Sequence, residues 1–424
     1  MTDNSAPHQA QTPGPVLADA APGYSIDPNE AAKDIVAAAL GAIPEAGELL
    51  SLLVEIFWPS GANDNQIWDS MEARVEALVN QKIQESVYNQ TEADLEGLQN
   101  VLQNYADAAK PGHTSSFTSQ NWTSARNEFA QRMPHFRVKG SELLLLPLWA
   151  QAANMHLSLL RDGVLFGMSW GWDDDDHTSI ITELKAAISD YTAWAPRIFG
   201  WGISSRLGTV SYHQCEPFRT SNAFHQQMVP AVLDLAQRWP LFDPTVHPGP
   251  IAPGQVYLTS EIYSTPVGTA DDSGLFLLPW QHPTQPPAQI TVWAEPNLID
   301  AIQVSYPTGG GPDGVSQTTR MGASTGTPAT IKIAPGNPVT TVDVWAGNVV
   351  QGLQFTFKDG TKTAHFGSSE GTRSTFDFYQ HDPQNPSGRI LSSIYVNGVS
   401  NYYNCIDAIV FGFRYELPPS PSVS

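Results

Sequence analysis

Clustered carboxylates and imidazoles are the side chains of this sequence best suited to chemistry. Asp173–Asp176 is a run of four carboxylates, and His177 follows it directly. Carboxylate oxygens suit hard cations, but such a run also suits the first turn of a helix, where negative charge stabilises the free N–H groups. We favour the helix start. His213, Cys215 and His225 lie close in the chain, yet their spacing fits no zinc pattern.

Motifs of known catalytic mechanisms are missing from the sequence. There is no Gly-x-Ser-x-Gly, no phosphate-binding loop and no His-Glu-x-x-His. A pair of carboxylates that would hydrolyse a glycosidic bond is not evident either. We therefore expect no enzyme activity and no cofactor.

Charge limits the classes of partner. The chain of 424 residues has 42 acidic and 21 basic side chains, and its formal net charge is -21. This excess argues against nucleic acid, because phosphate contacts need clustered Lys and Arg. It also argues against simple electrostatic docking on anionic lipid. Any role at a membrane must depend on apolar surface or on a specific receptor.

Cysteine usage and the N-terminus indicate where the chain folds. Cys215 and Cys405 are the only cysteines, which excludes a disulfide framework and favours two isolated buried thiols. The start, Met1–Ser5, lacks a basic region followed by an apolar run, so we expect no secretory signal. We expect a soluble protein in the cytoplasm that makes it.

The chain changes character once. Residues 27–250 have helical periodicity, and residues 251–417 have short alternating runs typical of strands. Residues 1–26, which are rich in Pro, Ala and Ser, and the tail 418–424 are predicted to be disordered.

Apolar residues at spacings of three and four predict six or seven helices. One helical face is predicted from Met71, Val75, Leu78, Val79, Ile83 and Val87, and others from Leu95, Leu98, Leu102 and Tyr105 and from Ile181, Leu184, Ile188 and Tyr191. Breaks are predicted at Trp58–Gly61, Lys110–Gly112 and Lys139–Gly140. Amphipathic helices joined by short links form a bundle.

An internal repeat organises the second half. Ile299–Tyr306 resembles Val350–Phe357, and both resemble Ile406–Phe413; the copies are offset by 51 and 56 residues. Within each copy apolar residues alternate, as a half-buried antiparallel strand requires. Three copies predict three similar sheets around one core.

One helix stands out by its length and apolar character. Glu142–Gly167 would span about 39 Å, enough for a hydrocarbon core of about 30 Å. Its first half is apolar on every side, and its second half carries polar groups that suit a partner helix or a water-filled lumen. The pattern alone fits a permanently buried core helix as well as a helix that later inserts into a membrane.

The segment Leu143–Leu157, with Leu159–Asp162 after it, closely resembles the central fifth helix of the insecticidal crystal toxins, the delta-endotoxins. Further segments resemble that family in the same order. Phe57–Ser60 resembles the end of its second helix, Val75–Ile83 its third, and Leu95–Leu98 with Tyr105 the passage into its fourth. Phe224–Met228 and Val232–Leu235 resemble its seventh helix, Phe242–Pro244 the residues after that helix, and Leu258–Tyr263 with Pro266–Gly268 the first strand of its second domain.

This resemblance implies a seven-helix bundle whose fourth and fifth helices insert as a hairpin, after which several copies assemble a pore. By position, the hairpin is about Asn121–Val138 plus Glu142–Gly167. Charges on its first arm, such as Arg126 and Glu128, suit a lumen-lining helix or a solvated face of the bundle. The residues that would form the pore are Leu144, Leu148, Gln151, Asn154, His156, Arg161 and Asp162.

The repeat, with the ending Gly398–Phe413, resembles the jacalin-like lectins, which are β-prisms of three four-stranded sheets. Those lectins hold sugar with a Gly-x-x-x-Asp loop, whose carboxylate accepts hydrogen bonds from sugar hydroxyls. The matching segments here, Pro296–Asp300, Gly347–Gln351 and Tyr403–Asp407, never combine the glycine with the aspartate. These residues either bind a glycan or receptor or only cap turns. The candidates are Asp300, Asn348, Tyr402, Tyr403, Asn404 and Asp407.

Together the resemblances imply a multidomain α and β protein, with a seven-helix bundle around a central apolar helix and a C-terminal, three-sheet, jacalin-like β-prism. The function they imply is that of a pore-forming insecticidal toxin. Its partners would be a target-cell membrane, a cell-surface glycan or glycoprotein receptor and further copies of itself, and it would act outside the cell that makes it. The alternative is a lectin whose helical bundle is only structural or oligomerising.

Overall fold

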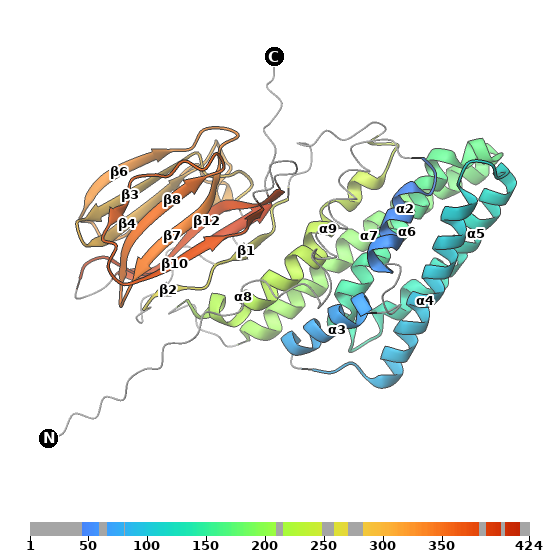
Figure 1. Ribbon diagram of the computed structural model, residues 1–424, viewed down its shortest axis with the longest axis horizontal. Coiled ribbons are helices and arrows are strands. Elements are labelled where there is room, and N and C mark those ends of the chain that lie inside the picture. Colours follow the sequence, from blue (N-terminus) through green and yellow to red (C-terminus); the bar gives the residue numbers. More distant parts are fainter. Residues whose placement is uncertain are drawn as a thin grey trace, which may run out of the picture.

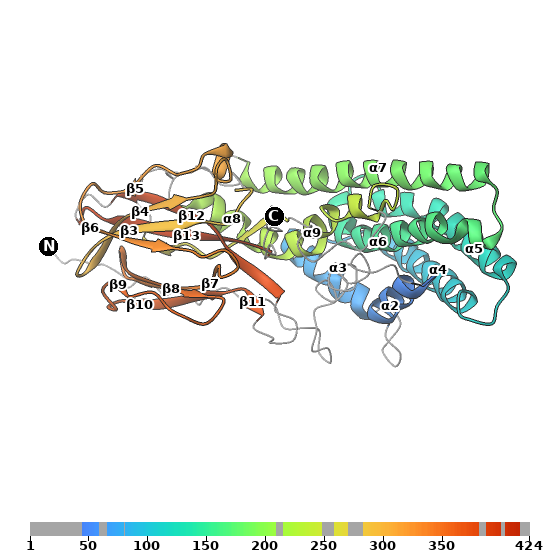
Figure 2. The ribbon, with the colours of Figure 1, turned by 90° about the horizontal axis from the view of Figure 1, so that it is seen from above.

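The computed structural model describes residues 45–58, 66–79, 81–208, 215–247, 258–269, 283–380, 387–399 and 403–415. Within these residues the helices come first and the strands come after them (Figure 1). A helical bundle and a body of three sheets lie end to end, and the long helix α7 runs along the bundle (Figure 2). The predicted leader 1–26, the tail 418–424 and Tyr402 lie outside the described residues.

Seven helical rods form the described part of the bundle, when α8, the π-helical η3 and α9 are taken as one continuous rod. Short 3-10 turns, η1 (Met133–Arg137), η2 (Gly167–Trp170) and η4 (Trp239–Phe242), come after α5, α6 and α9. The rods are α2 (Glu48–Phe57), α3 (Gln66–Val79), α4 (Glu85–Ala108), α5 (Ser115–Arg132), α6 (Glu142–Phe166), α7 (Asp174–Leu207) and α8–η3–α9 (Glu216–Met228, Val229–Leu233, Asp234–Ala236).

Local chemistry sets several of these ends. The carboxylate of Asp173 accepts a hydrogen bond from the N–H of Asp176 at 2.8 Å, so the acidic run caps and begins α7 as expected. The hydroxyl of Thr114 accepts one from the N–H of Phe117 at 3.3 Å and caps α5 in the same way. α4 ends at Ala108, just before the predicted break at Lys110–Gly112.

The single helical face predicted over Met71 to Val87 is wrong, because two helices share it. α3 ends at Val79, α4 begins at Glu85, and Gln81–Gln84 are not helical. A carboxylate oxygen of Glu76 accepts the N–H of Ile83 at 2.8 Å, which satisfies a backbone donor outside any helix. The side chain of Ile83 is buried even so, and the spacing of apolar residues therefore runs through the break without revealing it.

The central helix of the bundle is α6. Residues Leu143 to Val164 are all buried, including those of its polar second half. α6 contacts α2, α3, α5 and α7, and Figure 2 shows α7 along one side with α2 and α3 on the other. Among the described helices, the stretch Glu142–Trp170 has the length and hydropathy to cross a bilayer, which core helices of soluble proteins also have.

Three antiparallel sheets form the second body, as the repeat predicts. Two have four strands each, in the orders β10-β7-β8-β9 and β5-β4-β3-β6, and the other has five because its edge is split into β1 and β2. The strands are β1 (Glu261–Tyr263), β2 (Val267–Gly268), β3 (Gln289–Glu295), β4 (Leu298–Ser305), β5 (Met321–Gly322), β6 (Thr327–Lys332), β7 (Val339–Ala346), β8 (Val350–Phe357), β9 (Phe366–Gly367), β10 (Thr372–Asp377), β11 (Tyr379–Gln380), β12 (Ser387–Val399) and β13 (Ile406–Tyr415).

Strand register confirms the repeat at one position of each copy. Each copy places one glycine of a neighbouring edge strand opposite the same position, in the pairs Ala301 with Gly322, Gly352 with Gly367 and Ala408 with Gly268. All three edge glycines have positive φ, and a Cβ there would lie about 2 Å from the backbone carbonyl of Asp300, Gln351 or Asp407. The three repeat positions are therefore structurally equivalent.

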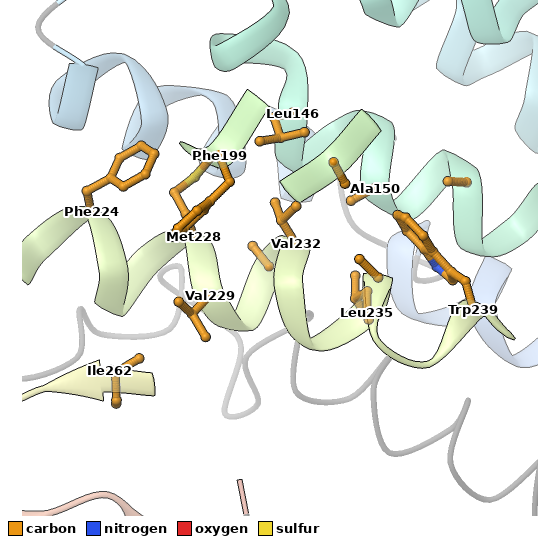
Figure 3. Packing of buried hydrophobic residues seen from close by; sticks show 14 of the residues in the cluster. Leu146, Ala150, Phe199, Phe224, Met228, Val229, Val232, Leu235, Trp239 and Ile262 are labelled. Carbon is orange, nitrogen blue, oxygen red and sulfur yellow. The ribbon is translucent and has the colours of Figure 1, made fainter. Parts of the chain in front are cut away.

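The rod α8–η3–α9 joins the two bodies. Figure 3 shows Met228, Val232 and Leu235 of the rod on the side of Leu146 and Ala150, while Ile262 of β1 lies beyond Val229 on the other side. All these residues belong to one buried apolar cluster that continues from the bundle into the sheets. The bundle and the prism thus share a core.

Polar contacts accompany this shared core. Arg389 of β12 forms a buried ion pair with Asp234 of α9. The carboxylate of Glu261, which begins β1 and is fully buried, accepts hydrogen bonds from Ser393 at 2.8 Å and from Tyr395 at 3.0 Å. The junction is therefore fixed by charge as well as by apolar packing.

Candidate functional site

Asp162 is a buried carboxylate in the polar half of α6. One of its carboxylate oxygens accepts the N–H of Gly47 at 2.8 Å and the hydroxyl of Tyr105 at 3.0 Å. Both donors come from outside the hairpin, Gly47 from the start of α2 and Tyr105 from α4. Arg161 beside it is buried too.

Amide side chains form the next contacts along α6. Asn154 donates to Gln151 at 3.1 Å and accepts the indole N–H of Trp239 at 2.6 Å, so it links α6 to η4. On the side of the other arm, the indole of Trp122 on α5 donates to the carbonyl of Leu159 at 2.7 Å. The polar half of α6 faces partner helices in this state.

His156 faces both α5 and α7. Its ring stacks on Phe129 of α5, with centroids 5.0 Å apart and planes 10° apart, and its Nδ1 lies 2.7 Å from the hydroxyl of Tyr191 on α7. Leu144 and Leu148, the predicted pore residues of the apolar half, are buried among the surrounding helices. The structure thus brings all seven residues predicted for the pore into the centre of the bundle.

Charged side chains of α5 and η1 pair with neighbouring helices. Arg126 donates to Glu183 of α7 at 2.8 Å, and Arg137 lies 2.7 Å from Asp190 of α7. On the opposite side, Asp94 of α4 holds Arg132 at 3.0 Å and His135 at 2.8 Å. These charges therefore bind the first arm of the hairpin to α4 and α7 and are not a freely solvated face.

A second group of candidates gathers at one end of the prism. Asp300 and Asp407 are buried, with exposed fractions of 2% and 4%, and Cys405 lies near both. Burial, together with the charges of Asp407 and Asp300, raises the pKa of the Cys405 thiol to about 12. Burial also raises the pKa of Asp300, with a smaller contribution from Glu295. The thiol is therefore protonated near neutral pH, and the two carboxylates are buried.

The loop of the third repeat meets a loop of the first at this end. The amide of Asn404 donates to the hydroxyl of Thr325 at 3.0 Å, and Arg320 donates to the carbonyl of Thr325 while its guanidinium lies 4.3 Å over the ring of Trp293. Sequence reasoning missed Thr325, Arg320 and Trp293. The signal that could have found Trp293 is the tripeptide Val-Trp-Ala, which precedes two of the repeat copies, at Val292–Ala294 and Val344–Ala346.

The remaining described candidates of the prism are exposed. Tyr403 is 54% exposed, and Asn404 and Asn348 are exposed too. The carbonyl of Asn348 accepts the N–H of Thr269 at 3.0 Å, which ties the second repeat to the edge of the third. An aromatic ring beside amide groups can stack on and hydrogen-bond a sugar. No group of three or more His, Cys, Asp or Glu among the described residues is placed to hold a metal ion.

Two known families match separate parts of the chain. Residues 35–243 match the delta endotoxin N-terminal domain, and residues 267–389 match the jacalin-like lectin domain. Among curated proteins, the pesticidal crystal protein Cry1Id of Bacillus thuringiensis is 29% identical over 275 residues, which are 62% of this chain and 37% of that protein. Cry7Ab of Bacillus thuringiensis subsp. dakota is 31% identical over 278 residues, 63% of this chain and 23% of its own length.

Solved structures share the fold. The insecticidal delta-endotoxin Cry8Ea1 of Bacillus thuringiensis superposes with a TM-score of 0.69 at 22% identity, over 93% of this chain and 74% of that one. PirB superposes with a TM-score of 0.64 at 15% identity, over 92% of this chain and 94% of that one. The matched region spans less than two fifths of the length of the curated relatives named above.

Proposed function

Because the chain joins a delta-endotoxin N-terminal domain to a jacalin-like lectin domain, we propose that it is a pore-forming pesticidal toxin. The prism binds a cell-surface glycan or glycoprotein receptor, and the hairpin of α5 and α6 then leaves the bundle and enters the membrane. Several copies assemble the pore. In this proposal residues 27–250 are the pore-forming domain and residues 251–417 the receptor-binding domain.

The fully buried α6 is the observation that carries the proposal. An apolar helix of membrane-spanning length is enclosed by other helices, and its polar groups bind partners on α2, α4, α7 and η4. A lone helix with Asp162 and Arg161 would be costly in lipid. Those groups can face other copies or a water-filled lumen instead, so insertion as an assembled hairpin is favoured over a single span.

Dye release from liposomes tests pore formation directly. The purified protein should release dye from vesicles made with target-cell membrane extract, and protein without such extract should release less. A protein that never permeabilises vesicles, with or without extract or protease treatment, would contradict the toxin and favour the lectin with a structural bundle.

Ion selectivity in a planar bilayer tests which helix lines the pore. Glu128 lies on α5, whereas Asp175 lies in the first turn of α7, which stays outside the hairpin. Glu128→Lys should shift the reversal potential toward anions, because it changes the charge of the lumen. Asp175→Lys changes the net charge equally and should leave the reversal potential unchanged. Equal shifts for the two variants would exclude α5 as the lining helix.

In this proposal the glycan is bound by the predicted set Asp300, Asn348, Tyr402, Tyr403, Asn404 and Asp407, of which all but Tyr402 lie within the described prism. Tyr403 is the exposed ring of this group, and Val315 is an apolar side chain of the same body with a similar exposure of 43%. Tyr403→Ala should weaken binding to a glycan array or to target membranes at least tenfold, and Val315→Ala should not. If Asp300→Ala and Asp407→Ala both leave glycan binding unchanged, those two carboxylates only cap turns and do not bind the glycan.

A further inference from the structure

A cavity of about 470 Å³ lies between the hairpin and α7, far along the chain from the residues of the prism. Phe129, Ala130, Met133 and Pro134, from α5 and η1, give it an apolar wall. Arg137 of η1, His156 of α6, and Asp190 and Tyr191 of α7 give it polar atoms. Its volume falls in the range of sites for small molecules. We call it the hairpin cavity.

His156 lines this cavity and carries one hydrogen-bond donor that has no described partner. The side chain is 6% exposed, and its Nε2 is buried without a partner among the described residues. The hydroxyl of Tyr191 has no acceptor in the described part of the chain other than His156 Nδ1, 2.7 Å away. We therefore assign the hydroxyl as the donor to Nδ1, which leaves the imidazole proton on Nε2.

Arg137 supplies the second donor. One nitrogen of its guanidinium pairs with Asp190 at 2.7 Å, and the group lies over the rings of Trp149 and Trp194 at 4.7 and 4.6 Å. These contacts fix its position. Its Nη2 is buried and bonds no described residue. Two donors without described partners, one of them cationic, thus belong to residues that line the cavity, together with an apolar wall, the Tyr191 hydroxyl and the Asp190 carboxylate that Arg137 already pairs.

We propose that the hairpin cavity binds a small carboxylate with an apolar body. The carboxylate oxygens accept hydrogen bonds from His156 Nε2 and Arg137 Nη2, and the apolar body packs on Phe129, Met133 and Pro134. Buried donors without an acceptor are unfavourable, which is why an acceptor is the group that the cavity selects.

If the protein is a pore-forming toxin as proposed, the position of the cavity means that a bound ligand would affect insertion of the hairpin. Its walls come from α5, η1 and α6, which would insert, and from α7, which would stay behind. A ligand that contacts both sides is lost when they separate, so it stabilises the soluble arrangement. Occupancy of the hairpin cavity should therefore slow insertion.

Isothermal titration with 3-phenylpropionate tests the site itself. Ala130 lines the cavity and is exposed, whereas Ser124 is exposed on the same helix but does not line it. Binding should be saturable, weakened at least tenfold by Ala130→Trp, which fills the cavity from its rim, and unchanged by Ser124→Trp. The alcohol 3-phenylpropan-1-ol should bind at least tenfold more weakly. Absence of saturable binding, or equal binding by the two variants, would overturn the site.

Dye release from liposomes then tests the consequence. Saturating 3-phenylpropionate should slow release by the native chain and by Ser124→Trp at least threefold, and should not slow release by Ala130→Trp. Unchanged release by the saturated native chain would overturn the restraint on the hairpin. If the protein binds the probe but never releases dye, the toxin function fails while the site stands, so the two proposals are distinguishable.

Discussion

The bundle and the prism both bury polar side chains, but they satisfy them differently. In the bundle, Asp162, Asn154 and His156 of one helix bind partners on four other elements, 35 to 115 residues away in the chain. In the prism, Asp300 and Asp407 lie at equivalent positions of a repeat, beneath loops that bond one another. Because these three side chains of α6 are bonded to other elements, the helix can leave the bundle only by losing those bonds, whereas the prism can stay folded.

The bundle and the prism meet at the ion pair of Asp234 and Arg389. Loss of this pair should give the largest change in stability. Asp234→Ala leaves the buried charge of Arg389 without its carboxylate, and removal of one partner of a buried pair costs about 3–5 kcal/mol of stability. Urea unfolding followed by circular dichroism would measure this loss. The double variant Asp234→Leu with Arg389→Met should cost less than the single one. An equal or larger cost would show that packing, not charge, fixes the junction.

The hydroxyl of Tyr105 offers a sharper probe of the bundle. Tyr105→Phe removes one of the two hydrogen bonds to the Asp162 carboxylate and should lower the free energy of unfolding by about 2 kcal/mol. It should also speed dye release, because one contact that holds α6 is gone.

Tyr88→Phe is the matched control. Its hydroxyl also donates to a carboxylate, that of Asp69 at 2.8 Å, but in an exposed position. The free energy of unfolding should change by less than about 1 kcal/mol. If the control destabilised the bundle as much as Tyr105→Phe, burial of Asp162 would not explain the effect.

Glu72 predicts a pH dependence of the stability of the bundle. Burial, and then the carboxylates of Glu76, Asp69 and Glu92, raise its pKa from 4.5 to about 7. Between these values the folded state holds a proton that the unfolded state has lost, so stability falls as pH rises from 4.5 through 7. The loss is at most about 3 kcal/mol and is complete above that window.

Urea midpoints at pH 5 and pH 8 would measure this fall. Glu72→Gln keeps a neutral side chain at both values, so its midpoint should change less between them than that of the native chain. The residue lines a narrow cavity with Leu148 of α6, so the loosening should reach the central helix. A native midpoint that is higher at pH 8 than at pH 5 would contradict the sign.

Sequence reasoning reached the two architectures but not the contacts within them. The apolar run Leu143–Leu157 and the threefold repeat are local patterns, so the central helix and the equivalence of Asp300, Gln351 and Asp407 could be predicted. The break after Val79 could not be predicted, because the apolar spacing continues across it. The backbone N–H of Ile83 is bonded to the side chain of Glu76 and not to a helical carbonyl. Pairs such as Asn404 with Thr325 join residues 79 apart, which no spacing reveals.

Thr325 gives the smallest expected effect on stability and the clearest contrast with the bundle. Its hydroxyl accepts from Asn404 at an exposed position, so Thr325→Val should change the free energy of unfolding by less than about 1 kcal/mol. The loop that carries Tyr403 would nevertheless lose a contact to the first repeat. Binding to target membranes or to a glycan array should therefore weaken, while dye release from receptor-free vesicles stays unchanged. If Thr325→Val altered receptor-free release as Tyr105→Phe is expected to, the prism and the bundle would not divide recognition from insertion.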